Sequence, residues 1–248
     1  MTLQQDWEEL ARLDPLWAIL SYRDKRFGRW DLRQFFATGD RQVRGHLDHA
    51  AELGYPGDHR AVLDFGCGVG RLAPALSTGF ETYCGVDISE RMVAHARHLH
   101  ASRPNCTFLV SSDDALQGMA DASFDLVFTL YVLQHLPARR SILAYLRSFL
   151  RVLRPGGLLL FQLPARIPPL EKLAYDSRRV LYLGLRRAGA SSRLLHRYLG
   201  LSPMVMNHLH ESEVLAVLAA HGGMVVDIER VRGGIAIDDR TYYVTRSG

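Results

Sequence analysis

The chain has few cysteines and no long apolar run. Its 248 residues include only three cysteines, Cys67, Cys84 and Cys106, an odd number with no close pair. This count argues against a disulfide framework and a zinc site, so we expect buried core thiols and predict no metal. No apolar stretch approaches the roughly 20 residues that a membrane-spanning helix needs, so no transmembrane segment is expected.

The N-terminus lacks the pattern of a secretory signal. Residues 1–15 contain four acidic side chains and no apolar core segment, which a signal peptide requires. We therefore expect a cytoplasmic protein. Hydrophobic residues make up 48% of the chain and charged residues 23%, which is ordinary for a globular protein, and the length suits one large α/β domain.

Positive charge is concentrated in one segment. The net charge is only +4, yet residues 164–206 contain eight basic and two acidic side chains. Apolar residues at helical spacing separate these basic residues: Leu170, Leu173, Val180, Leu181 and Leu185. We call Arg166–Arg197 the basic segment. Four roles are open for this segment. It is a solvated helix, a lid for an anionic or lipid-like acceptor, a contact with a membrane surface, or a homodimer interface.

Short apolar runs alternate with helical patterns after residue 59, which predicts a parallel sheet covered by helices on both faces. Predicted strands occupy residues 61–65, 81–86, 106–110, 124–129, 158–163, 225–231 and 241–246. Predicted helices occupy residues 70–77, 89–101, 139–153 and 213–221. The last two strands are joined through Gly233-Gly234 without room for a helix, which predicts an antiparallel hairpin.

The same patterns divide the chain. Residues 1–58 are helical and polar-aromatic in character and form a predicted N-terminal helical cap. Residues 59–248 form the main domain, with a helical lid inserted at about residues 165–208.

A glycine-rich turn follows the first predicted strand. The run Asp64-Phe65-Gly66-Cys67-Gly68-Val69-Gly70 leads from a strand into a helix. Glycine lets the backbone approach a ligand closely, and the N-terminus of a helix favours an anionic group. The third glycine falls one position early for a dinucleotide fingerprint, which disfavours NAD. Asp87 ends the next strand about 20 residues further on, where a carboxylate can accept hydrogen bonds from ribose hydroxyls.

Four motifs in this order resemble those of the class I S-adenosylmethionine-dependent methyltransferases, specifically bacterial enzymes that act on small molecules. The motifs are Val62–Leu72, Gly85–Ser89, Phe124–Phe128 and Leu153–Gly157, within a resemblance that covers about residues 60–163. It implies a Rossmann-like seven-stranded sheet of order 3-2-1-4-5-7-6 with an antiparallel last strand and helical caps. It also implies methyl transfer from S-adenosylmethionine to an oxygen, nitrogen or carbon of a small-molecule acceptor.

The resemblance assigns roles to individual residues of the cofactor site. Gly66 and Gly68 line the methionine part, with Asp64 directly before them, and Asp87 takes the ribose. Ile88 and Met92 flank the adenine.

The adenine edge and the floor of the site follow from the same resemblance. Asp113 or Asp114 accepts a hydrogen bond from the adenine amino group, unless these residues only form a turn. Leu130 begins the stretch that forms the floor of the methyl-transfer site.

Two histidines are candidate general bases for a hydroxyl acceptor, His135 and His210. His135 follows the fourth strand, and a structural role bonded to backbone is its alternative. His210 precedes the helix at 211–221, and its neighbour His208 stays a further candidate. Arg71 either pairs the cofactor carboxylate or is solvated.

An aromatic block, Trp30–Gly39, resembles the lid segment of the same enzymes, where rings cover the sulfonium. Its alternative is an aromatic helix face packed on the sheet.

Three other functions compete with this interpretation. A nucleic-acid methyltransferase would use the basic segment as a phosphate track, but no base-flipping motif follows the fourth strand, so nucleic acid is not expected as a partner. A cofactor-binding protein without catalysis is the second alternative. An NAD oxidoreductase, opposed by the glycine spacing, is the third.

Overall fold

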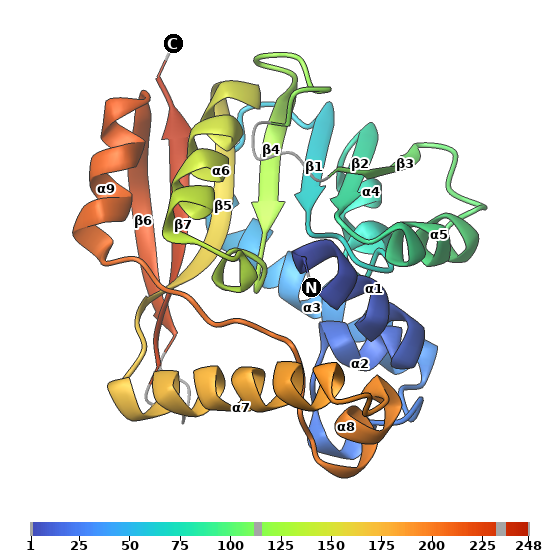
Figure 1. The fold of residues 1–248 in the computed structure, drawn as a ribbon. Coiled ribbons are helices and arrows are strands. Elements are labelled where there is room, and N and C mark those ends of the chain that lie inside the picture. Colours follow the sequence, from blue (N-terminus) through green and yellow to red (C-terminus); the bar gives the residue numbers. More distant parts are fainter. Residues whose placement is uncertain (1, 112–115, 232–236, 248) are drawn as a thin grey trace.

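One seven-stranded sheet forms the centre of the structure, a computed structural model that describes residues 2–111, 116–231 and 237–247 (Figure 1). The strand order is β3-β2-β1-β4-β5-β7-β6. The strands are β1 (Ala61–Phe65), β2 (Thr82–Asp87), β3 (Cys106–Val110), β4 (Phe124–Thr129), β5 (Leu153–Arg166), β6 (Gly223–Val231) and β7 (Asp238–Arg246). β1 to β5 pair in parallel, and β7 is antiparallel to both β5 and β6. The predicted strand order and antiparallel last strand are confirmed.

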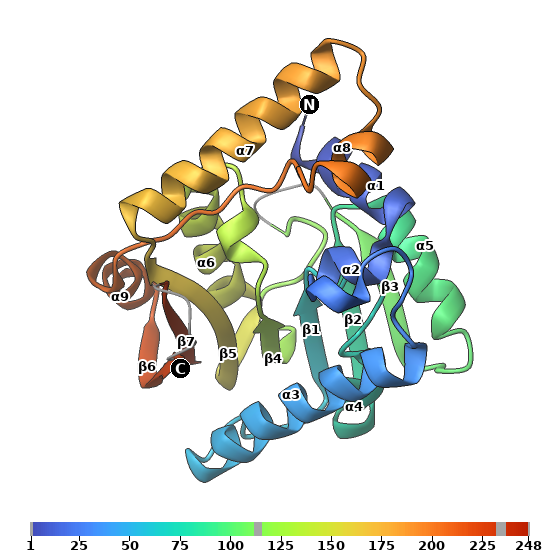
Figure 2. The same ribbon diagram turned by 90° about the horizontal axis from the view of Figure 1, so that it is seen from below.

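Helices cover both faces of the sheet. They are α1 (Leu3–Leu13), α2 (Pro15–Ile19), α3 (Leu32–Glu52), α4 (Ala73–Gly79), α5 (Glu90–Leu99), α6 (Arg139–Val152), α7 (Pro169–Arg187), α8 (Ser192–Tyr198) and α9 (Glu211–Ala220), with short 3-10 turns at Arg23–Lys25 and Leu133–His135. α3 and α4 lie on one face, and α6 and α9 lie on the other (Figure 2). None of the described helices is long and apolar enough to cross a membrane.

Two apolar cores result from the alternation of side chains along each strand. In β4, Val127 packs toward Leu146 of α6, whereas Leu126 and Phe128 pack on the other face, with Leu76 of α4. All five side chains are fully buried. Because both faces of a parallel strand are buried, such strands read as continuous apolar runs, which is why the sequence revealed them.

The carboxyl ends of β1, β2 and β4 meet at one edge of the sheet. α1, α2, α7 and α8 lie across this edge, so that segments far apart in the sequence meet there (Figure 1). A crevice at the carboxyl edge of an open α/β sheet is the usual place for a ligand.

Some boundaries differ from the prediction. α4 begins at Ala73 and not at residue 70, because Gly70 has φ +78°, outside the helical region. β5 is longer than predicted, and the basic segment contains two helices, α7 and α8. Gly233-Gly234 lies outside the described residues. The division of the chain at residue 58 and the lid at 165–208 stay predictions.

Candidate functional site

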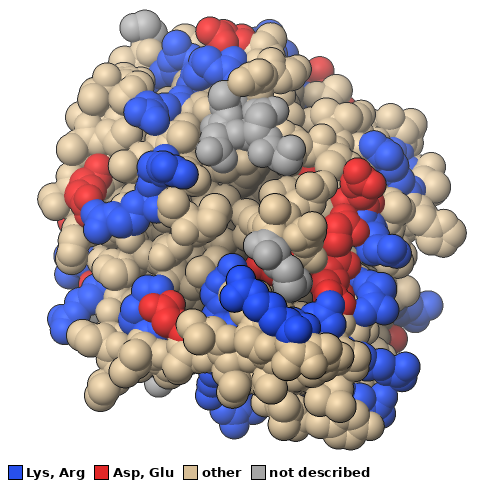
Figure 3. Space-filling view, viewed as in Figure 1, with Lys and Arg blue, Asp and Glu red and all other residues tan. Residues whose placement is uncertain are grey.

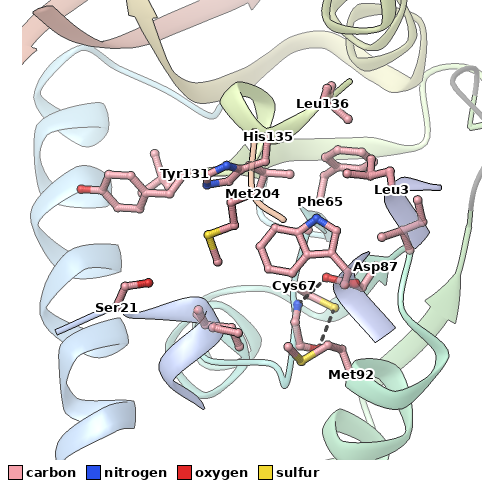
Figure 4. Close-up of a pocket in the computed structure, with 18 of the residues that line it drawn as sticks. Leu3, Ser21, Phe65, Cys67, Asp87, Met92, Tyr131, His135, Leu136 and Met204 are labelled. Carbon is pink, nitrogen blue, oxygen red and sulfur yellow. Dashed lines mark hydrogen bonds between the residues drawn. The ribbon is translucent and has the colours of Figure 1, made fainter. Parts of the chain in front are cut away.

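A cavity of about 830 Å³ lies at the carboxyl edge of the sheet. Its size is in the range of small-molecule and cofactor sites. Eight of the residues that the sequence assigned to a site line it: Asp64, Gly66, Gly68, Asp87, Ile88, Met92, Leu130 and His135. Figure 4 shows Asp87, Met92 and His135, from three different elements, around this one cavity.

The glycine turn keeps the backbone open at the cavity. Gly66 has φ +77° and Gly68 has φ +55°, which side chains with a Cβ rarely adopt. A Cβ on Gly66 would lie 2.3 Å from the Val132 side chain, and one on Gly68 would lie 2.5 Å from Ile19. Both neighbours also line the cavity, so a side chain at either position would collide with the cavity wall and change its shape.

Asp87 is held at the end of β2 by the glycine turn itself. Its Oδ2 accepts a hydrogen bond from the Gly68 N–H at 2.9 Å, and its Oδ1 accepts one from Ser89 N–H at 2.9 Å. Burial raises the pKa of Asp87, while these N–H groups oppose the rise. Each carboxylate oxygen can accept a second hydrogen bond, so Asp87 suits a pair of ribose hydroxyls.

Asp64 lies on the inner side of the same turn and is almost fully buried. The Tyr83 hydroxyl donates to its Oδ2 at 2.7 Å. Burial nevertheless raises the pKa of Asp64 to about 7. A cation placed beside Asp64 would favour its ionised form, so the position fits a ligand ammonium.

Arg71 is a buried cation that lines the cavity. Its guanidinium donates to Gln42 at 2.6 Å and to Thr38 at 3.3 Å, both on α3. Among the described residues, no carboxylate lies within 4.0 Å of it, and burial lowers its pKa. Buried charges are normally paired, so Arg71 can accommodate an anionic group of a ligand.

His135 is fixed in one tautomer. Its Nδ1 lies 2.8 Å from the Val205 carbonyl oxygen, which can only accept, so Nδ1 carries the proton and Nε2 carries a lone pair. Burial lowers the pKa of His135. The indole of Trp7 packs edge-to-face with the imidazole, with 5.7 Å between the ring centroids. A neutral imidazole beside the cavity can accept a proton from a bound hydroxyl.

The other predicted residues are placed differently. His210 begins α9, where its backbone N–H donates to Glu213 at 3.2 Å, and its ring faces His208. Neither histidine lines the cavity, and the role of His210 as a base stays a prediction. Asp113 and Asp114 lie outside the described residues, while Ser111, two residues before Asp113, lines the cavity.

The aromatic rings of the cap come from an earlier segment than predicted. Trp7 of α1 and Trp17 of α2 line the cavity. Trp30, which the sequence placed in the lid, is instead buried against Phe35 at 5.5 Å. The spacing of Leu3, Trp7 and Leu10 gives an apolar helix face, and this was the signal available for α1.

The basic segment contributes to the cavity and fastens the cap. Tyr175 and Arg178 of α7 line the cavity. Arg179 pairs with the buried Asp6 at 3.2 Å, and Arg186 meets Glu9 at 3.4 Å. Two of the arginines are therefore ion-paired with α1.

The three cysteines are free thiols. Burial raises the pKa of Cys67 far above its usual value and that of Cys84 to about 11. At neutral pH both stay protonated, as expected of inert core thiols.

Comparison with known proteins agrees with this geometry. A family model described as a methyltransferase domain matches residues 63–161. The ubiquinone biosynthesis O-methyltransferase of Paracidovorax citrulli is 34% identical over 158 residues, which are 61% of this chain and 62% of that protein. The 27-O-demethylrifamycin SV methyltransferase of Amycolatopsis mediterranei is 34% identical over 69% of this chain and 61% of that one. This chain thus spans less than two thirds of these curated relatives.

A solved structure extends the likeness to the whole fold. The magnesium protoporphyrin IX methyltransferase of Synechocystis, with bound SAH (S-adenosylhomocysteine), has a TM-score of 0.63 at 20% identity, over 99% of this chain and 98% of that chain. The strand order, the glycine turn with Asp87 and these matches all indicate a methyltransferase fold. Residues 63–161 therefore match a methyltransferase domain, and the whole fold is that of the methyltransferase structure.

Proposed function

We propose that the chain binds S-adenosylmethionine in this cavity and transfers its methyl group to a hydroxyl oxygen of a small-molecule acceptor. The observation that carries the proposal is the presence, in one cavity, of the glycine turn with Asp87 and of the unprotonated nitrogen of His135. Relatives from Paracidovorax and Erwinia are named O-methyltransferases, which supports oxygen as the acceptor atom.

The residues present fit the cofactor. Asp87 would accept from the ribose hydroxyls, and Ile88 and Met92 would flank the adenine. Asp64 would face the ammonium of the methionine part, and Arg71 its carboxylate. Asp113 and Asp114 stay predicted partners of the adenine amino group.

The bound cofactor supplies a methyl group on a positively charged sulfur, which is already a good leaving group. The chain then has to hold acceptor and cofactor in line and close together. His135 Nε2 would accept the proton of the acceptor hydroxyl, which would leave the acceptor oxygen able to take the methyl group that the cofactor supplies. The rings of Trp7 and Trp17 exclude water and favour the positive charge.

The alternatives receive less support. Arg179 and Arg186 are paired with acids of α1 and so are not available for a phosphate track. A homodimer and a cytoplasmic location stay predictions.

A screen with methyl-labelled S-adenosylmethionine tests the proposal. We expect label to enter hydroxyl oxygens of metabolites and not RNA or DNA. Label found only on nitrogen or carbon would contradict oxygen transfer. Binding of S-adenosylhomocysteine with no transfer to any acceptor would favour the non-catalytic alternative.

A further inference from the structure

α7 turns an apolar face away from the molecule. Four of its large apolar side chains are exposed, at 81%, 64%, 70% and 52% of their surface: Leu170, Leu173, Val180 and Leu181. With 3.6 residues per turn these four fall on one side of the helix, together with the small residues Ala174, Ser177 and Gly184. We call these seven residues the outer face of α7. Single exposed leucines are common, but a contiguous apolar helix face marks an interaction site.

The outer face is bordered by positive charge. Arg178 lies at one edge and Arg187 at the other, by the same helical spacing. Both are exposed, and neither forms an ion pair within the described residues. The two acids of α7, Glu171 and Asp176, fall outside this face, and Asp176 is paired with Lys172 at 2.6 Å.

The opposite side of α7 fixes how the helix sits. Tyr182 is buried there, and Arg179 and Arg186 are held by the acids of α1. The outer face therefore cannot turn inward without breaking these contacts.

We propose that the outer face of α7 docks on an anionic membrane surface. An amphipathic helix with an apolar side and flanking arginines lies in the interface, with its apolar side among the upper acyl chains and its cations at the headgroups. In Figure 3 the lower edge of the molecule, over α7, is largely uncharged and carries lysine and arginine more than acidic residues. This composition matches an anionic lipid.

Two other occupants fit less well. A second copy docked through the same face would offer no acid on that face to pair Arg178 and Arg187. A nucleic-acid backbone would meet the arginines but leave the leucines and Val180 without an apolar partner.

Docking would also place the cavity beside the lipid, because Tyr175 and Arg178 of α7 line it. If the proposed function holds, an acceptor with an apolar body could then enter from the membrane. The docking itself depends only on α7.

Vesicle co-sedimentation of the full chain tests the proposal. We expect at least tenfold stronger binding to vesicles of equal parts phosphatidylglycerol and phosphatidylcholine than to phosphatidylcholine alone. Leu173→Ser/Val180→Ser should weaken it at least tenfold, through lost apolar burial. Arg187→Gln should weaken it about fivefold, since one arginine near such a surface contributes about 1 kcal/mol. Leu109→Ser and Arg44→Gln, at exposed positions elsewhere, should change nothing.

The proposal is overturned if the chain shows no preference for phosphatidylglycerol, or if neither α7 variant differs from its control. It is equally overturned by a dimer in place of vesicle binding. In that case sedimentation velocity would show a dimer that Leu173→Ser/Val180→Ser dissociates, and the chain would not bind vesicles. Titration with S-adenosylhomocysteine should be unchanged in both α7 variants. This titration shows that the variants are folded and tests the proposed function separately.

Discussion

At the scale of single residues, burial sets the protonation of the site. It raises the pKa of Asp64 to about 7 and lowers that of His135. The free protein near neutral pH therefore has an imidazole that can accept a proton and a carboxyl that titrates. Both states can be tested separately.

The first prediction concerns His135 as general base. His135→Gln should lower the methyl-transfer rate about 10²–10⁴-fold and leave the affinity for S-adenosylhomocysteine within twofold. Because the base must be neutral and burial holds its pKa below 6.5, wild-type activity should fall only as pH drops below that value. Rate measurements against pH check both points. Exposed His98→Gln is the control, and an unaltered rate in His135→Gln would show a purely structural histidine.

The second prediction concerns Asp64 and stability. The folded chain holds a proton between pH 3.8 and about 7 that the unfolded chain releases. The free energy of unfolding should therefore fall as pH rises through this window, because ionised Asp64 is disfavoured in the fold. Denaturant titrations at pH 5 and pH 8 measure this.

Asp64→Asn is the matched variant, since it cannot ionise. Its pH dependence should be flatter than that of the wild type. Identical slopes in the two proteins would show that Asp64 does not titrate in this range.

At the scale of elements, two contacts build the site, one between the glycine turn and α2 and one between α1 and α7. A Cβ on Gly68 would strike Ile19 at 2.5 Å, so turn and cap approach each other without room for a side chain. Asp6 and Arg179 are 173 residues apart in the chain, and their ion pair joins the N-terminal helix α1 to α7.

The third prediction is that Gly68→Val abolishes binding of S-adenosylhomocysteine while the sheet stays folded. The branched side chain would collide with Ile19 in the cavity wall and strain a backbone with φ +55°. Calorimetry and circular dichroism measure the two effects. Gly45→Val, on α3 with open space around it, is the control. Normal binding by the Gly68 variant would place the ligand elsewhere.

The fourth prediction is that Arg179→Met loosens the contact between α1 and α7. Asp6 would be left buried and unpaired, which costs about 3–5 kcal/mol in comparable sites. We expect faster proteolysis within α1 and α7 and little change in the sheet. Arg187→Met, at an exposed position of the same helix, should be cleaved like the wild type. Equal cleavage of the two variants would show that the ion pair does not hold the caps.

At the scale of the whole molecule, the sheet was predictable and the caps were not. The first five strands, the glycine turn and Asp87 follow from short patterns in residues 60–163, because buried parallel strands and tight turns leave local signals. The strand order follows from the family resemblance that these motifs carry. The predicted lid at Trp30–Gly39 did not include Trp7 and Trp17, which line the cavity, because their place depends on how α1 and α2 pack over the edge of the sheet. His210 lies outside the cavity lining, and its role as a base stays a prediction because its place depends on the path of the chain after α8.

The most direct test of the account is calorimetric titration of the full chain with S-adenosylhomocysteine. We predict saturable binding with one site per chain and no binding of NAD. Asp87→Ala should weaken the affinity at least tenfold, since a hydrogen bond to a charged group contributes about 1.5–3 kcal/mol. Exposed Asp48→Ala should leave it unchanged. The account would be contradicted by an absence of binding, by binding of NAD in its place, or by an affinity that Asp87→Ala does not alter.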